Sequence, residues 1–185
     1  MNMENKKSTP LFFWQIISAH TVSYTIAGVI ALYLFNYRAL WEMEAMSVFY
    51  RAIDTPIVAL GPFLQIFRGI IVALILLPLR KTFFEEKHGL LKLGLVILGF
   101  SIISTYGAVI ASFEGLIYLD LPLSVHLWGI PEGLIWLSLF IGILKVMIDY
   151  SHRRVVLISS VIAVLLICLL STFGFLAALA TGGLL

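Results

Sequence analysis

Five long apolar stretches constrain this chain more than any other feature, because each is long enough to cross a bilayer as a helix. A membrane helix needs about 20 predominantly apolar residues to cross a hydrocarbon core of about 30 Å. The stretches occupy most of the 185 residues, so we predict an all-α bundle forming a single transmembrane domain over residues 1–185. The predicted spans are Leu11–Tyr37, Pro56–Leu79, Leu90–Ala111, Ser124–Ile148 and Val155–Ala177.

The composition favours the same class of protein. Hydrophobic residues make up 61% of the chain and charged residues 12%, whereas soluble domains carry about 25% charged residues. A soluble chain this short lacks the polar side chains needed to cover so much apolar surface. The expected partner is therefore the lipid bilayer, and a net charge of +2 gives no reason to expect nucleic acid.

The positive residues predict the side of the membrane on which each end of the chain lies. Nine of the twelve Lys and Arg residues fall in the N-terminal tail and in the loops after the second and fourth spans. Only Arg38 and Arg51 fall on the opposite side, and Arg68 lies inside the second span. Positive loop residues concentrate in the cytoplasm, so we expect a plasma or inner membrane protein with its N-terminus inside and its C-terminus outside. The nine residues are Lys6, Lys7, Arg80, Lys81, Lys87, Lys92, Lys145, Arg153 and Arg154.

The segment between the first two spans has a helical pattern of its own. Apolar residues recur at helical spacing between Arg38 and Asp54, with charged residues among them. That pattern is typical of a short amphipathic helix on the outer membrane surface. Trp41 and Phe49 on its other face make packing against the bundle an equally good interpretation.

Arg68 is the charged residue placed deepest in the predicted bundle. It lies near the middle of Pro56–Leu79, where an arginine costs about 2.5 to 3.5 kcal/mol on insertion scales. At about 1.5 Å per residue, neither end of the span is within easy reach of its side chain. Gln65 and two glycines share its helical face. We therefore expect this face to meet protein or a water-filled cavity.

Glu132 is the carboxylate that we expect to reach Arg68 if the fourth span begins near Ser124. Two features point elsewhere. Pro131 suits the first turn of a helix, and Glu132 beside it suits the positive end of the helix dipole. The helix could then begin at Pro131, either at the outer surface or after a re-entrant segment. The sequence leaves these alternatives open.

Other polar residues follow helical spacing in the first and third spans. His20 and Tyr24 belong to a polar strip in the first span, and Ser104 and Thr105 interrupt the third. Small and hydroxyl residues often mark close approach between membrane helices, so packing is one interpretation for each. The predicted ligand-binding set is Arg68, Gln65, His20, Tyr24, Glu132 and Thr105.

Signatures of catalysis and metal binding are missing from the sequence. It contains no His-Glu-x-x-His, Cys-x-x-Cys, Gly-Lys-Ser or Gly-x-Ser-x-Gly run. We expect no cofactor and no metal, and we favour a non-enzymatic role over an intramembrane enzyme using Glu114, His126 and Glu132. Cys168, the single cysteine, cannot form an intrachain disulfide.

The resulting functional hypothesis is a small multi-pass membrane protein that binds or permeates a small polar or anionic ligand. The ligand would lie in a polar cavity around Arg68. The main alternative is an accessory or assembly subunit of a larger membrane complex. Either role is compatible with a homo-oligomer or with other membrane subunits as partners.

Overall fold

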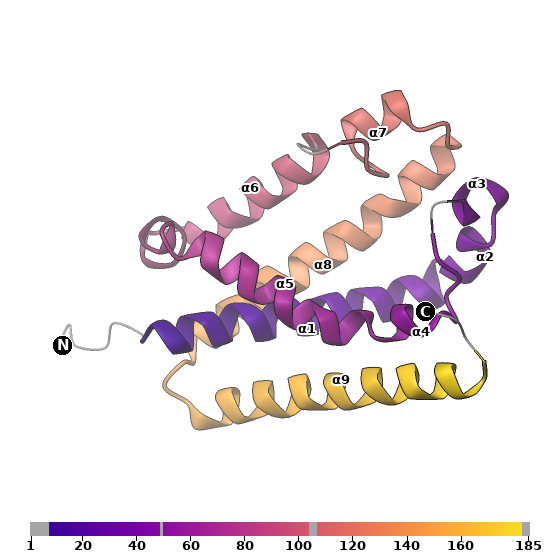
Figure 1. Cartoon of the computed structure of the whole chain (residues 1–185). Helices are drawn as coiled ribbons and strands as arrows, with labels where there is room; N and C mark the ends of the chain where they lie inside the picture. The colour runs from indigo at the N-terminus through magenta and orange to yellow at the C-terminus, as the bar shows by residue number, and fades with distance from the viewer. Residues whose placement is uncertain (1–7, 49, 104–106, 183–185) are drawn as a thin grey trace.

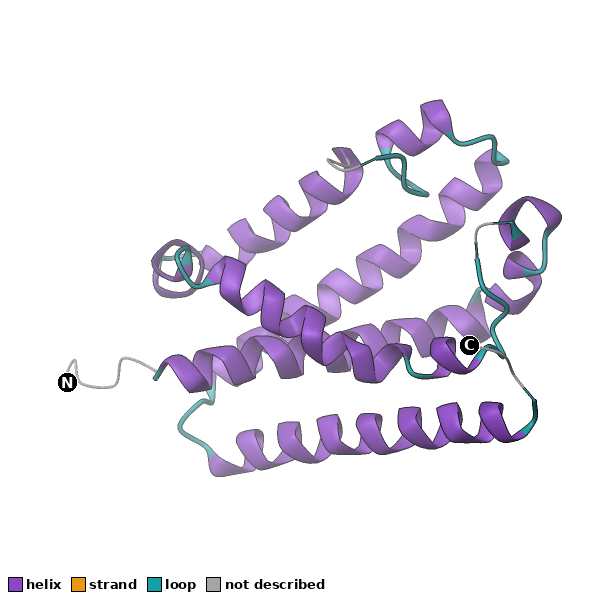
Figure 2. Ribbon diagram, in the orientation of Figure 1, coloured by secondary structure: helices purple, strands orange, loops and turns teal. Residues whose placement is uncertain are grey.

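The computed structural model describes residues 8–48, 50–103 and 107–182, and this part of the chain is helical without a strand (Figure 2). Helices account for 80% of the structure, which confirms the all-α prediction. The elements are α1 (Thr9–Leu34), α2 (Tyr37–Trp41), α3 (Glu44–Ser47), α4 (Pro56–Ala59), α5 (Gly61–Leu76), the π-helical turn η1 (Lys81–Glu85), α6 (Gly89–Ile103), α7 (Phe113–Tyr118), α8 (Leu123–Asp149) and α9 (Arg154–Ala180).

Three of these helices are long and apolar enough to cross a membrane, and they are α1, α8 and α9. The apolar helices α5 and α6 are shorter, with 16 and 15 residues. Many large apolar side chains on these helices are exposed, including Leu170 and Phe173 of α9 at 71% and 73%. Such a surface suits lipid and not water, and the three long apolar helices fit a membrane protein.

Helix α1 is the central element of the bundle. It packs against α5 and α8, which cross it at an angle, and less extensively against α9 (Figure 1). The connections gather at two ends. The start of α1, η1 and the α8–α9 connection lie at one end, and α2, α3, α7 and the end of α9 lie at the other (Figure 1).

The chain leaves α1 earlier than the sequence predicts. The helix ends at Leu34 instead of Tyr37, because Asn36 adopts a left-handed backbone with φ of 49°, a conformation that Asn tolerates better than most residues. The predicted amphipathic helix over 38–54 is also wrong as a single element. The chain turns at Glu42 and Met43, and this turn separates the two short helices α2 and α3.

The second and fourth predicted spans differ in continuity. Leu60 separates α4 from α5, so Pro56–Leu79 is not one uninterrupted helix. Helix α8, in contrast, runs from Leu123 to Asp149 with Pro131 inside it. A helix start at Pro131 is therefore excluded, and Glu132 lies within a helix that begins nine residues earlier.

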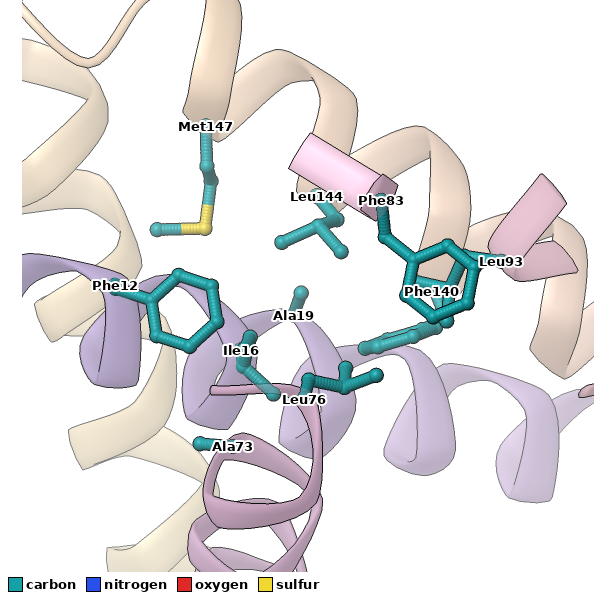
Figure 3. Packing of buried hydrophobic residues seen from close by; sticks show 10 residues of the cluster. All are labelled: Phe12, Ile16, Ala19, Ala73, Leu76, Phe83, Leu93, Phe140, Leu144 and Met147. Carbon is teal, nitrogen blue, oxygen red and sulfur yellow. The ribbon is translucent and has the colours of Figure 1, made fainter. Parts of the chain in front are cut away.

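The apolar core lies where the N-terminal half of α1 meets α5 and α8. Phe12 and Ile16 of α1 face Leu76 of α5 and Leu144 of α8 (Figure 3). The guanidinium of Arg80 lies 5.1 Å from the centre of the Phe12 ring and closes the core at this end.

Gly69 sets the distance between α1 and α5. A Cβ atom added at this position would lie 2.9 Å from the Cα atom of Ile17. Backbone atoms cannot yield as a side chain can, so the two helices must separate to accept any larger residue. Close approach through a small residue is a common way for membrane helices to pack.

We predict that Gly69→Ala lowers the stability of the bundle by about 1 to 3 kcal/mol, the usual cost of overpacking. Reversible unfolding in mixed micelles measures this change. Gly99→Ala is the matched control, because a Cβ atom at Gly99 meets nothing within 4 Å; it should be neutral or stabilising by about 1 kcal/mol through helix propensity. Equal effects of the two substitutions would contradict the predicted α1–α5 contact.

Candidate functional site: a cavity at the α2–α3 end of the bundle

A cavity of about 440 Å³ lies at the end of the bundle opposite the apolar core. Its walls come from the second half of α1, the segment between α1 and α4 that contains α2 and α3, the α4–α5 junction and the first half of α8. Its volume falls within the range of about 300 to 1,000 Å³ typical of small-molecule sites. The described lining residues include Tyr24, Thr25, Gly28, Leu32, Tyr37, Leu40, Trp41, Tyr50, Ile53, Val58, Gly61, Pro62, Val125, Gly129 and Glu132.

Glycines on two helices help to keep this space open. Gly28 of α1 and Gly61 of α5 line the cavity, and a Cβ atom added at either one meets nothing within 4 Å. Larger side chains at these positions would project into the space. The cavity therefore depends on the absence of side chains at Gly28 and Gly61.

Glu132 supplies the charged group of the cavity. It is half-buried on α8, and the hydroxyl group of Tyr37 on α2 donates a short hydrogen bond to its Oε2 atom. The bond joins residues that are 95 positions apart in the sequence. It therefore joins α2 to α8 across the cavity.

Aromatic residues of the segment between α1 and α4 form one wall of the cavity. The rings of Trp41 and Tyr50 lie 5.3 Å apart at 35° to each other. Burial and the hydrogen bond to Glu132 raise the pKa of Tyr37, and burial together with the charge of Glu132 raises the pKa of Tyr50. Both phenols consequently stay protonated at physiological pH and remain hydrogen-bond donors.

Ser171 of α9 hydrogen-bonds to the backbone on both sides of the break between α4 and α5, at the edge of the cavity. Its hydroxyl group donates to the carbonyl oxygen of Ala59 at 2.6 Å and accepts from the backbone N–H of Phe63 at 3.4 Å. These two groups would bond each other in a continuous helix. A side chain inserted into the helix ladder is a known cause of a helix break.

We predict that Ser171→Ala destabilises the protein by about 1 to 3 kcal/mol, because it removes the hydrogen-bond partner of a partly buried backbone carbonyl and N–H at the helix break. The free energy of unfolding in micelles measures the loss. Ser159→Ala is the control, since that exposed hydroxyl bonds only the carbonyl of Val156 in its own helix. If both variants keep full stability, Ser171 does not support the α4–α5 junction.

His20 and Gln65 form a buried polar contact deeper in the bundle. The Nε2 atom of His20 and the Oε1 atom of Gln65 lie 3.1 Å apart. The His20 ring also lies edge-on to Trp136 and Phe140 of α8, with ring centres 5.7 and 6.1 Å away. The structure therefore brings together two of the predicted site residues, and it places them between α1, α5 and α8.

The side chain of Arg68 does not face the interior of the bundle, although its position in the second predicted span suggests that it should. Its side chain is exposed on α5, while the next residue, Gly69, is buried against α1. No ion pair joins Arg68 to Glu132 among the described residues, and Arg68 is not among the described residues that line the cavity. The positive charge and the negative charge of the predicted site thus occupy separate places.

Among the predicted site residues, Tyr24 is the one that lies near both Glu132 and Arg68. It lines the cavity, and it lies within electrostatic range of both Glu132 and Arg68. Thr105, the remaining predicted site residue, lies outside the described residues, as does Ser104.

The residues proposed for an enzymatic site have structural partners of their own. The Nδ1 atom of His126 accepts a hydrogen bond from the backbone N–H of Ala111 at 3.2 Å, and Glu132 accepts from Tyr37. No described contact joins Glu114, His126 and Glu132. Within the described part of the chain, no group of three His, Cys, Asp or Glu residues is arranged to hold a metal ion.

Sequence reasoning named Tyr24 but not the other aromatic residues of the cavity. It placed Tyr37 at the end of the first predicted span, and it placed Trp41 and Tyr50 in a segment that either lies on the membrane surface or packs against the bundle. Their density was the available signal, because four aromatic residues fall within 14 positions. Nothing in the sequence, however, indicates that they pack over Glu132.

Comparison with known proteins adds no relative. No protein-family model, curated protein or solved structure matches this chain.

Proposed function

We propose that this protein is a non-enzymatic, multi-pass membrane protein that binds a small polar ligand in the cavity beside Glu132. The observation that carries the proposal is the cavity itself. A carboxylate lies inside a largely apolar space of about 440 Å³ that glycines keep open. Apolar walls with a few placed polar groups are the usual form of a small-molecule site.

Polar groups continue from the cavity toward the middle of the bundle. Tyr24 stands at the cavity wall, and the His20–Gln65 contact lies one helical turn further along α1. Polar side chains at this depth are costly and commonly functional. This arrangement supports a path for a ligand from the cavity toward the middle of the bundle. Permeation along this path would follow binding in the cavity.

We also propose five membrane crossings with the N-terminus in the cytoplasm. The proposal is supported by the short gap between α4 and α5, which are separated by Leu60 alone. The gathering of the positive loops at one end of the bundle supports it too (Figure 1). The cavity would then open toward the outside of the cell.

Single cysteines in a Cys168→Ser background test this topology in intact cells with a membrane-impermeant thiol reagent. We expect Ser47→Cys and Thr181→Cys to be labelled directly, because both would lie outside. Lys87→Cys and His152→Cys should be labelled only after permeabilisation. Labelling of His152→Cys in intact cells would contradict the five-span orientation.

A thermal-shift screen of the purified protein tests the proposed binding. The probes are choline, benzoate and glucose, which represent a cation, an anion and a neutral polar molecule. We expect at least one probe to raise the melting temperature by mass action. Gly28→Leu should abolish that rise by filling the cavity, whereas Gly99→Leu, also in open space, should preserve it. A rise that survives Gly28→Leu would place the ligand elsewhere.

We predict that Arg68→Met raises the stability of the protein in micelles by about 2 kcal/mol. The substitution removes a charge from an apolar depth, where insertion scales assign a cost of this size. Gln65→Met on the same helix is the comparison, and it should lower stability because it takes away the partner of His20. A fall in stability for Arg68→Met would show that the guanidinium has favourable partners in the folded bundle.

An accessory role in a larger membrane complex is the second candidate function. Helix α6 favours it, because α6 packs mainly on α8 and η1 and exposes Leu91, Leu95 and Phe100 at 59–61%. Native mass spectrometry after mild solubilisation separates the two functions. A stoichiometric protein partner supports the accessory role, and an isolated monomer or homo-oligomer supports the binding protein.

A further inference from the structure

We propose that the cavity beside Glu132 selects an organic cation, held through a quaternary or alkylated ammonium group. This inference rests on the proposed ligand-binding function and names the chemical class of its ligand. It departs from the expectation of an anion, which the sequence attached to Arg68.

The charge of the cavity favours a cation. Glu132 is the one charged side chain among the described lining residues. Its hydrogen bond from Tyr37 orients the carboxylate and satisfies one of its lone pairs, which leaves further acceptor capacity for a ligand. An anion in the same space would be repelled by Glu132, and Arg68 lies outside the described lining and cannot compensate there.

The aromatic walls favour an ammonium group in particular. Tyr24, Tyr37, Trp41 and Tyr50 all line the cavity together with Glu132. The faces of Tyr and Trp rings attract cations, and several such rings around one space form the usual site for quaternary ammonium ligands. The tilted pair of Trp41 and Tyr50 provides two neighbouring ring surfaces on one wall.

The rest of the lining argues against a bare metal ion. Most of the remaining described side chains are aliphatic, such as Leu32, Leu40 and Ile53. Calcium and magnesium are bound mainly by carboxylate and carbonyl oxygens, whereas Glu132 is the one carboxylate among the described lining residues. A cation with alkyl substituents fits this lining, because the aliphatic walls can cover its carbon atoms.

The acidic residues around the cavity end would attract such a ligand. Five carboxylates and two guanidinium groups belong to the connections at this end, which leaves a net charge of −3 before Glu132 is counted. A local excess of one sign raises the concentration of counter-ions near a cleft. The carboxylates are Glu42, Glu44, Asp54, Glu114 and Asp120, and the guanidinium groups belong to Arg38 and Arg51.

Isothermal titration calorimetry of the purified full chain tests the inference with two probes of nearly equal shape. Choline carries a quaternary nitrogen, and 3,3-dimethyl-1-butanol has a carbon atom in its place and no charge. We expect choline to bind at least tenfold more tightly than the neutral alcohol. This comparison uses the unmodified protein, so it does not depend on whether a variant folds.

Glu132→Gln should reduce choline affinity at least tenfold and leave the weak binding of the neutral alcohol unchanged. The amide oxygen can still accept the Tyr37 hydrogen bond, so the variant should keep its fold. Glu114→Gln is the matched control, because Glu114 belongs to the same end but is not among the described lining residues. Trp41→Leu should weaken choline binding, and Trp128→Leu, which removes a ring packed against Phe35, should not.

The inference is overturned if the neutral alcohol binds as tightly as choline, or if benzoate binds in the cavity more tightly than either. In both cases a rise in melting temperature that Gly28→Leu abolishes would still support the proposed binding function. If no probe of any charge binds in a manner sensitive to Gly28→Leu, both the function and the inferred ligand class fail.

Discussion

The need to satisfy backbone hydrogen bonds away from water governs this bundle. An unpaired N–H or C=O group in hydrocarbon costs several kcal/mol, so irregular backbone is tolerated only where protein or water covers it. The α4–α5 junction meets this requirement through Ser171 of α9, which bonds the backbone of Ala59 and Phe63. The contact also docks α9 and allows a helix to break beside a cavity.

Helix α1 organises the two halves of the molecule differently. Its N-terminal half carries large apolar residues such as Phe12 and Ile16, which are buried in the core with α5 and α8. Its C-terminal half carries Tyr24 and Gly28, which border open space. One helix therefore contributes to the apolar core at one end and to the cavity at the other, and Gly69 lets it approach α5 closely.

The cavity depends on a tertiary contact between a loop and a helix. Tyr37 follows directly after the left-handed residue Asn36, which turns the chain back over the bundle and brings the Tyr37 phenol to Glu132. The connection between α1 and α4 thus covers the cavity and also supplies its aromatic wall. The proposed cation and the Tyr37 phenol would therefore share the carboxylate of Glu132.

Length and apolar composition were enough to predict the membrane environment, the all-helical fold and the approximate bounds of the long helices, because both are local properties of the chain that favour lipid over water. The sequence also predicted His20 and Gln65 as interior residues, and it left open whether Glu132 lies inside the bundle or at its outer surface. The contacts between these residues follow from the tertiary packing: Glu132 bonds Tyr37, Gln65 contacts His20, and the side chain of Arg68 is exposed. Partners 45 and 95 positions apart depend on how the helices are rotated and crossed, and helical periodicity alone contains no record of that geometry.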